Sequence, residues 1–191
     1  MKIKGRIVGG ILVVISVGCY WAFSSNKIEV HPNRPLVWGD FKQVALINGR
    51  ESINATCITT TDFQINRMYE EEGYKRIDLK ARIAIQQEQT RVSLQFLSRA
   101  NKATKEQVLN HENGHFKIAQ IIGRRIVNMV DAFRFHPADY QSQLDSIVRS
   151  NYKDWAGLDR EYDQITTNPR NPEKQKEWDL WFREELKKLG S

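Results

Sequence analysis

The spacing of apolar residues changes along the chain, and it predicts strands first and helices afterwards. Strict alternation from Ile77 to Ile85 predicts a half-buried antiparallel strand. A partial alternation of Thr, Ile and Phe from Ile53 to Tyr69 predicts a longer strand, and Glu70 to Lys75, with its glycine, predicts the hairpin loop between the two. A third strand candidate, Arg91 to Leu97, precedes the first long helix. The residues expected on the buried face of the clean strand are Ile77, Leu79, Ala81, Ile83 and Ile85.

From Thr104 to His136 the apolar spacing becomes three or four residues with no proline, which predicts a helix. Thr104 and Gln107 have the spacing of a capping box at its start. Its buried stripe is expected to contain Val108, His111, His115, Ile118, Ile122, Ile126, Met129 and Phe133.

Two more helices are expected after that one. The first runs from Ala138 to about Thr166, and the second begins with Asn171 as N-cap and Pro172 at the first helical position, and ends near Leu189. The fold class predicted is α+β, a small antiparallel sheet followed by packed helices.

The N-terminus has a different pattern, because Lys2, Lys4 and Arg6 precede an apolar run over residues 7–23. A positive start and a short apolar stretch are typical of an export signal. Three outcomes stay open: cleavage near Ala22-Phe23-Ser24, lipidation at Cys19, or retention as an apolar anchor helix. We favour retention, and the positive-inside rule then places the remaining chain outside the cytoplasm, in the cell envelope or periplasm.

These patterns divide the chain into a signal or anchor segment at 1–25, a polar linker with two prolines at 26–35, and one domain at 36–191. Hydrophobic residues make up 40% of the chain and charged residues 27%, which is typical of a globular protein. The net charge of +6 comes without a basic block or an aromatic platform, so no nucleic-acid partner is expected. With Cys19 in the apolar segment, Cys57 is left alone and the domain has no internal disulfide.

The candidate chemistry lies in the first long helix, at residues 111–115, which have the pattern H-E-x-x-H. Histidines four residues apart on a helix lie on one face and can bind one Zn²⁺ ion. Zinc lowers the pKa of a bound water to about 7, and Glu112, on a neighbouring face, is placed to accept its proton. Gly114 is a weak helix former, and its small size suggests that another part of the backbone comes close there.

A catalytic zinc site needs a third protein ligand and keeps one position open. A histidine six residues after the motif is excluded, because Ile121 stands there. The candidates in the next helix are Asp159 and Asp163, which share a face, and Glu161, which points elsewhere; His136 at a helix break is weaker, and His31 lies in the linker.

Three segments together resemble a bacterial domain family of unknown function whose members are described as predicted secreted zinc-dependent proteases. Residues 37–41 are similar to its opening W-x-D-F, residues 111–118 to its H-E-x-G-H-F-x-I helix, and residues 162–166 to its Y-D-x-x-T segment. The resemblance implies a zincin-like fold and favours Asp163 as a metal ligand or as a group that orients one. The family usually has a histidine shortly after the threonine, in T-x-H-G, where this chain has Asn168.

The function predicted is that of an exported zinc-dependent peptidase acting on peptide or protein substrates. Glu112 is the general base, His111, His115 and Asp163 hold Zn²⁺, and Tyr162 is a candidate donor to the oxyanion. The alternative, favoured by Asn168, is an envelope-anchored zinc-binding or assembly module without catalytic activity.

Overall fold

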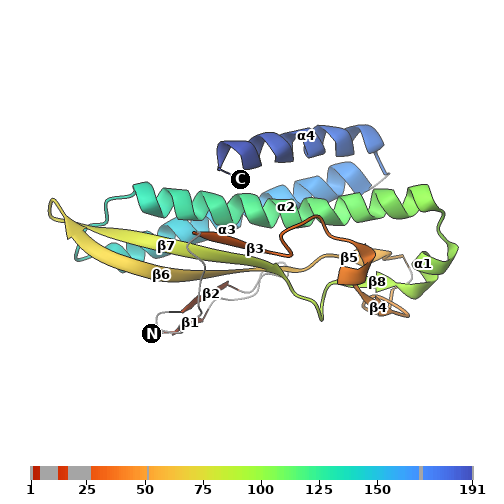
Figure 1. The fold of residues 1–191 in the computed structure, drawn as a ribbon, viewed down its shortest axis with the longest axis horizontal. Helices are drawn as coiled ribbons and strands as arrows, with labels where there is room; N and C mark the ends of the chain where they lie inside the picture. The colour runs from red at the N-terminus through yellow and green to blue at the C-terminus, as the bar shows by residue number, and fades with distance from the viewer. Residues whose placement is uncertain (1, 5–12, 17–26, 51, 168–169, 191) are drawn as a thin grey trace.

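A computed structural model of the chain describes residues 2–4, 13–16, 27–50, 52–167 and 170–190. Within these ranges strands come first and long helices follow, which confirms the α+β class (Figure 1). The strands are β1 (Lys2–Lys4), β2 (Val13–Ser16), β3 (Ile28–His31), β4 (Lys42–Val44), β5 (Ala55–Thr56), β6 (Thr59–Glu71), β7 (Tyr74–Ile85) and β8 (Arg91–Ser93). The helices are the 3-10 helix η1 (Trp38–Asp40) and the α-helices α1 (Leu94–Arg99), α2 (Lys102–Ala132), α3 (Tyr140–Thr167) and α4 (Pro172–Lys188).

The strands form two mixed sheets, with orders β1-β2-β6-β7-β3 and β4-β8-β5. The β6–β7 hairpin is antiparallel as predicted, but β3 runs parallel to β7 and β4 runs parallel to β8. The expected antiparallel sheet is therefore corrected to a mixed one. Alternation in a sequence reports which face of a strand is buried and does not report the direction of its neighbour. The segment 26–35, expected to be a linker, includes β3, which pairs from Ile28↔Ala81 to His31↔Ala84.

Helix α2 covers one face of the larger sheet, and α4 lies on the other side of α2 (Figure 1). The alternation in β7 is confirmed, since Ile77, Leu79, Ala81 and Ile83 are each at most 2% exposed. Helix α2 is buried on more than one side because α3 and α4 also pack against it. Its predicted stripe holds in the middle and is wrong at the end, where Met129 and Phe133 are exposed.

Two helix starts differ from expectation. The N-cap of α2 is Asn101, whose side-chain oxygen accepts a hydrogen bond from the Thr104 amide at 2.8 Å, so the helix begins before the predicted Thr104 cap. The segment 91–97, expected to be one strand, divides into β8 and α1 because Ser93 caps a helix there. The last helix begins at Pro172 with Asn171 as its N-cap, as predicted.

The predicted apolar anchor helix, residues 7–23, falls largely outside the described ranges. Its described part, Val13–Ser16, is strand β2. Among the described residues, no helix is both long and apolar enough to cross a membrane.

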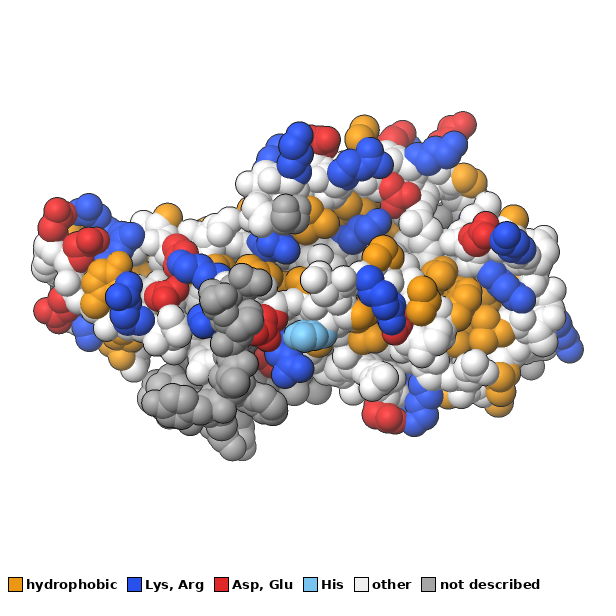
Figure 2. Space-filling model, in the orientation of Figure 1, with side chains coloured by type: hydrophobic (Ala, Val, Ile, Leu, Met, Phe, Trp, Pro, Cys, Tyr) orange, Lys and Arg blue, Asp and Glu red, His pale blue; other side chains and the backbone are white. Residues whose placement is uncertain are grey.

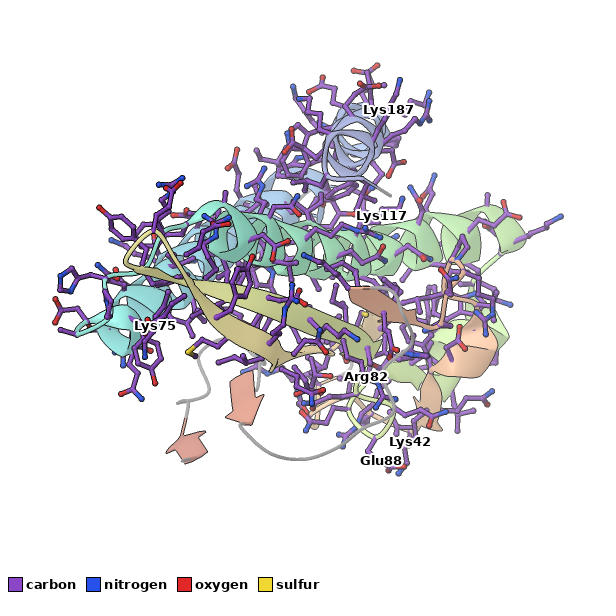
Figure 3. The ribbon with its side chains drawn as sticks, turned by 60° about the vertical axis from the view of Figure 1, so that its left-hand side comes forward. Lys42, Lys75, Arg82, Glu88, Lys117 and Lys187 are labelled. Carbon is purple, nitrogen blue, oxygen red and sulfur yellow. The ribbon has the colours of Figure 1, made fainter. Side chains whose placement is uncertain are left out.

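Acidic and basic side chains are interspersed over the face shown in Figure 2 and do not form a patch of one sign there. The cations labelled in Figure 3 belong to β4, β7, α2 and α4, and Lys42 pairs with Glu88. This distribution is that of a solvated surface.

Candidate metal centre

The H-E-x-x-H motif lies in the first half of α2, where the helix is covered by α3 and by the chain before β6. Asn113 attaches the segment before η1 to this turn: its Oδ1 accepts the Leu36 amide at 2.7 Å, and its Nδ2 donates to the Leu36 carbonyl at 3.2 Å. Arg34 and Asp40 pair at 2.7 Å on either side of this contact. The W-x-D-F segment and the H-E-x-x-H motif are thus packed against each other, although about seventy residues separate them.

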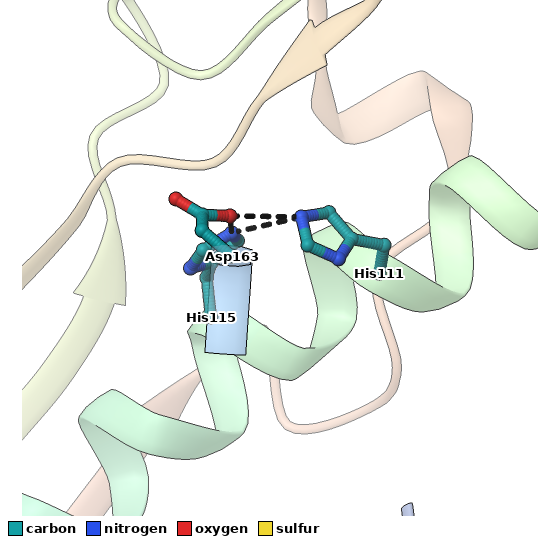
Figure 4. A group of neighbouring side chains, drawn as sticks. All are labelled: His111, His115 and Asp163. Atoms are coloured by element: carbon teal, nitrogen blue, oxygen red, sulfur yellow. Dashed lines mark hydrogen bonds and ion pairs between the residues drawn. The ribbon is translucent and has the colours of Figure 1, made fainter. Parts of the chain in front are cut away.

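Three donor atoms meet at the face of α2 that looks toward α3 (Figure 4). Oδ1 of Asp163 lies 3.2 Å from Nε2 of His111 and 3.2 Å from Nε2 of His115, and the two Nε2 atoms are 3.2 Å apart. Ligands of a tetrahedral ion at about 2.0–2.2 Å stand roughly 3.3–3.6 Å from one another. The spacing fits one small cation, so His111, His115 and Asp163 form a group that could hold a metal ion.

Each histidine is oriented by a partner on its other ring nitrogen. Nδ1 of His115 donates to Oδ1 of Asp159 at 2.7 Å. Nδ1 of His111 lies 3.1 Å from the Thr166 hydroxyl, which itself donates to the Tyr162 carbonyl at 2.6 Å and therefore accepts from the histidine. Both contacts place a proton on Nδ1, so the Nε2 atoms, which face Asp163, are the ones left to bind a cation, an arrangement that metal sites commonly use.

Charge in the cluster is balanced by protons when no cation is bound. Burial alone would lower the pKa of His115, but its hydrogen bonds to Asp159 and Asp163 raise that pKa well above its ordinary value. Burial acts in the opposite direction on Asp163, yet the two histidines hold the pKa of its carboxyl well below the usual range. The protein therefore keeps a positive charge beside Asp163, and a metal cation can take the place of that proton.

Glu112 lies beside this group without belonging to it. Its side chain lines the same pocket and the residue is only 5% exposed. Burial raises the pKa of Glu112, while the nearby histidines and a hydrogen bond from the Cys57 backbone amide oppose that rise. The result is a desolvated carboxylate, oriented by a backbone amide and close to the two histidines of the motif.

Tyr162 lies behind the candidate metal group and not on the pocket side, where a donor to the oxyanion would be expected. The residue is fully buried, and its ring stacks on His111 with centroids 4.8 Å apart and planes at 10°. Its hydroxyl lies 3.0 Å from both the His111 carbonyl and Oε1 of Gln175, so its proton is used behind the metal group. Tyr162 does not line the pocket. The geometry makes it a support for His111 and corrects the assignment to the oxyanion.

Gly114 explains how Tyr162 comes so close. A Cβ atom built at Gly114 would lie 2.1 Å from the Tyr162 hydroxyl oxygen and 2.3 Å from Cζ. The small residue in the motif makes room for a side chain of α3, and not for another backbone segment as the sequence suggested.

We expect Gly114→Ala to lower the free energy of unfolding by about 1–3 kcal/mol, since the methyl group must displace a fully buried ring. The measurement is urea unfolding of the full-length chain. Gly157→Ala is the matched control, because a Cβ there meets nothing within 4 Å. Because Ala favours a helix more than Gly does, the control substitution should raise the free energy of unfolding by up to about 1 kcal/mol. Equal unfolding midpoints for the two variants would contradict the close approach.

The metal group forms part of a pocket of about 680 Å³. Its walls are residues 52–59, the start of the motif on α2, and one face of α3. The sequence did not indicate the first wall, because nothing in the pattern of 52–59 distinguishes a strand that lines a pocket from one that lies elsewhere in a sheet. The volume of the pocket lies within the roughly 300–1,000 Å³ that ligand-binding pockets commonly have.

The remaining sequence candidates lie elsewhere or act differently. Asp159 contacts His115 through Nδ1, on the opposite side of the ring from the metal-facing nitrogen. Glu161 is exposed and does not line the pocket. His136 follows α2 and lies near Asp139, while His31 is in β3 near Glu29. Asn168 lies outside the described residues, and the three described donors come together without it.

Comparison with known proteins gave one family match. A family model described as "Bacterial protein of unknown function (DUF922)" matches residues 44–179, which include strands β5 to β8, the candidate metal group and the first part of α4. The comparison with curated proteins and that with solved structures gave no match.

Proposed function

The chain belongs to the DUF922 family of bacterial proteins of unknown function, and we propose that it is a zinc-dependent peptidase. The observation that carries the proposal is the triangle of donor atoms, 3.2 Å on each side, at the wall of a pocket that also contains a buried carboxylate. Metal ions that only stabilise a fold usually have four protein ligands, whereas catalytic zinc keeps one position open. Three protein donors beside a pocket fit the catalytic arrangement.

The donor set favours zinc among the common ions. Two imidazoles and one carboxylate are a frequent zinc set, and the hard ions Mg²⁺ and Ca²⁺ prefer oxygen ligands alone. Asp159 and Thr166 orient the two imidazoles from behind, which keeps both Nε2 atoms available. When bound, zinc supplies Lewis acidity that polarises a substrate carbonyl and makes a water molecule more acidic.

Glu112 supplies the proton transfers in this proposal. Its carboxylate accepts the proton of the attacking water and later donates that proton to the leaving amine of the peptide. Desolvation raises the pKa of Glu112 above that of an ordinary carboxylate, which makes it a stronger base for the first step. The Cys57 amide fixes the orientation of the carboxylate and is supplied by the pocket wall.

We also propose that the substrate is met outside the cytoplasm. The charged start and apolar run of residues 1–25 support export or anchoring in the cell envelope. A peptide or protein substrate is supported by the volume of the pocket, about 680 Å³, which is large enough for several side chains.

A cleavage assay tests the proposal. The full-length chain is purified, its metal content is measured, and it is incubated with a peptide library before chelation, after chelation, and after Zn²⁺ is returned. We expect about one zinc per chain and hydrolysis that is lost on chelation and recovered with zinc. Bound zinc with no hydrolysis of any library peptide would support the non-catalytic binding module in its place.

A further inference from the structure

The pocket contains one basic side chain that the proposed chemistry does not use. Arg170 lines it together with the acidic residues Glu112, Asp159 and Asp163, and it is the one lysine or arginine among the described lining residues. The three acids are all engaged, with the metal-binding histidines or with the Cys57 amide. In the part of the chain that the structure describes, the Arg170 side chain has no hydrogen-bond or ion-pair partner.

The backbone at Arg170 is held in place although its side chain is exposed. Thr167 and Arg170 form an antiparallel bridge, and the next amide, of Asn171, donates to the Thr166 carbonyl at 3.1 Å. Thr166 is the residue whose hydroxyl orients His111. Arg170 therefore starts from a fixed point close to the metal group, with a guanidinium that is free to meet a ligand.

The pocket runs along α3, because Trp155, Asp159, Asp163 and Thr167 all line it and recur every four residues. Trp155 is buried and makes that end apolar, whereas Arg170 makes the other end cationic. One helical turn separates Asp163 from Thr167, about 6 Å along the axis. Since an extended peptide advances about 3.3–3.6 Å per residue, a group bound by Arg170 lies within roughly three residues of the donor atoms.

We propose that Arg170 binds a carboxylate of the substrate, either the C-terminal carboxylate of a peptide or an Asp or Glu side chain near the cleaved bond. This inference rests on the proposed peptidase function for the identity of the ligand. A guanidinium matches a carboxylate with two parallel hydrogen bonds, and lysine cannot reproduce that geometry. The acids in the pocket would otherwise repel such a group, so Arg170 determines whether anionic peptides can bind.

The test measures binding separately from hydrolysis. Zinc-loaded full-length Glu112→Gln protein is titrated with three dye-labelled pentapeptide libraries built from Ala, Phe and Leu: one with a free C-terminus, one amidated, and one amidated with a single internal Glu. Fluorescence anisotropy gives the dissociation constants. A further Arg170→Gln or Arg170→Lys substitution is compared with Arg160→Gln, an exposed arginine on α3 that does not line the pocket.

We expect Arg170→Gln to weaken binding of a carboxylate library by about 10-fold or more and to leave the neutral amidated library unchanged. Arg170→Lys should recover only part of the loss, and Arg160→Gln should change nothing. A loss confined to the free-acid library identifies the C-terminal carboxylate, and a loss confined to the internal-Glu library identifies the side chain. Equal affinities for all three libraries, with or without Arg170, would overturn the inference. The result does not depend on turnover, so a wild-type protein that fails to hydrolyse peptides contradicts the proposed function alone.

Discussion

Glu112→Gln is expected to retain zinc and to hydrolyse peptides at least about 100-fold more slowly than the wild type, because a positioned general base contributes roughly that factor. The substitution preserves the size of the side chain and removes its ability to accept a proton. Glu112 lies outside the group of three donor atoms, so metal content should stay near that of the wild type. The amide that replaces the Glu112 carboxylate keeps an oxygen for the Cys57 backbone N–H, so the pocket wall should stay in place.

The matched control is Glu161→Gln, which makes the same chemical change at an exposed position outside the pocket. Its turnover and zinc content should both equal those of the wild type. The decisive measurement is kcat with metal content determined on the same samples. Hydrolysis by zinc-loaded Glu112→Gln at the wild-type rate would refute the role of Glu112 as general base, even if the metal ion is bound as proposed.

Helix α2 could be predicted from the sequence because its pattern is local. Apolar residues at spacings of three and four, a proline-free stretch and two histidines four apart depend only on helix geometry. The exposed Met129 and Phe133 show where the local pattern fails. Val127 and Val130 are buried at this end of the helix, so the buried face has turned away from the predicted stripe. No periodicity within one helix reports where its neighbours lie.

The residues alone narrow the third candidate metal ligand to two aspartates of α3 and do not choose between them. Asp159 and Asp163 share a face of α3, and only the packing of α3 on α2 decides which one meets Nε2 and which one meets Nδ1. The family resemblance favoured Asp163 because it lies in the Y-D-x-x-T segment. The structure brings Asp163 to both histidines and turns Thr166, of the same segment, toward His111.

Tyr162 shows why proximity in sequence was misleading. It precedes Asp163 by one residue, and neighbours on a helix point about 100° apart. One side chain therefore faces the donor atoms while the other packs behind them against Gly114. The glycine of the motif and the tyrosine of α3 contact each other, and this contact can be recognised only once the packing of the two helices is known. Strand β3 could not be predicted for the same reason. It is a four-residue strand in a polar segment, and it forms by pairing with β7, which its own sequence does not reveal.

The largest effect on metal binding is expected from His115→Ala, which removes a donor atom and leaves Asp163 and Asp159 without the ring that both contact. Stoichiometric zinc should be lost, because two donors remain where a site needs three. Asp163→Ala should have a similar effect for the same reason. Competition with a chromophoric chelator measures the affinities, and circular dichroism checks that each variant folds.

The Asp159→Asn substitution tests a residue that orients His115 without being expected to bind the metal ion itself. Asn keeps an oxygen that can accept from Nδ1 of His115 but loses the negative charge, so zinc affinity should fall by about 10–100-fold without loss of the site. Asp154→Asn, at an exposed position on the same helix, is the control and should bind zinc like the wild type. Zinc affinity is therefore expected to be highest in Asp154→Asn, lower in Asp159→Asn, and lowest in Asp163→Ala and His115→Ala. A His115→Ala protein that is folded and still holds one zinc ion per chain would show that the ion is bound elsewhere.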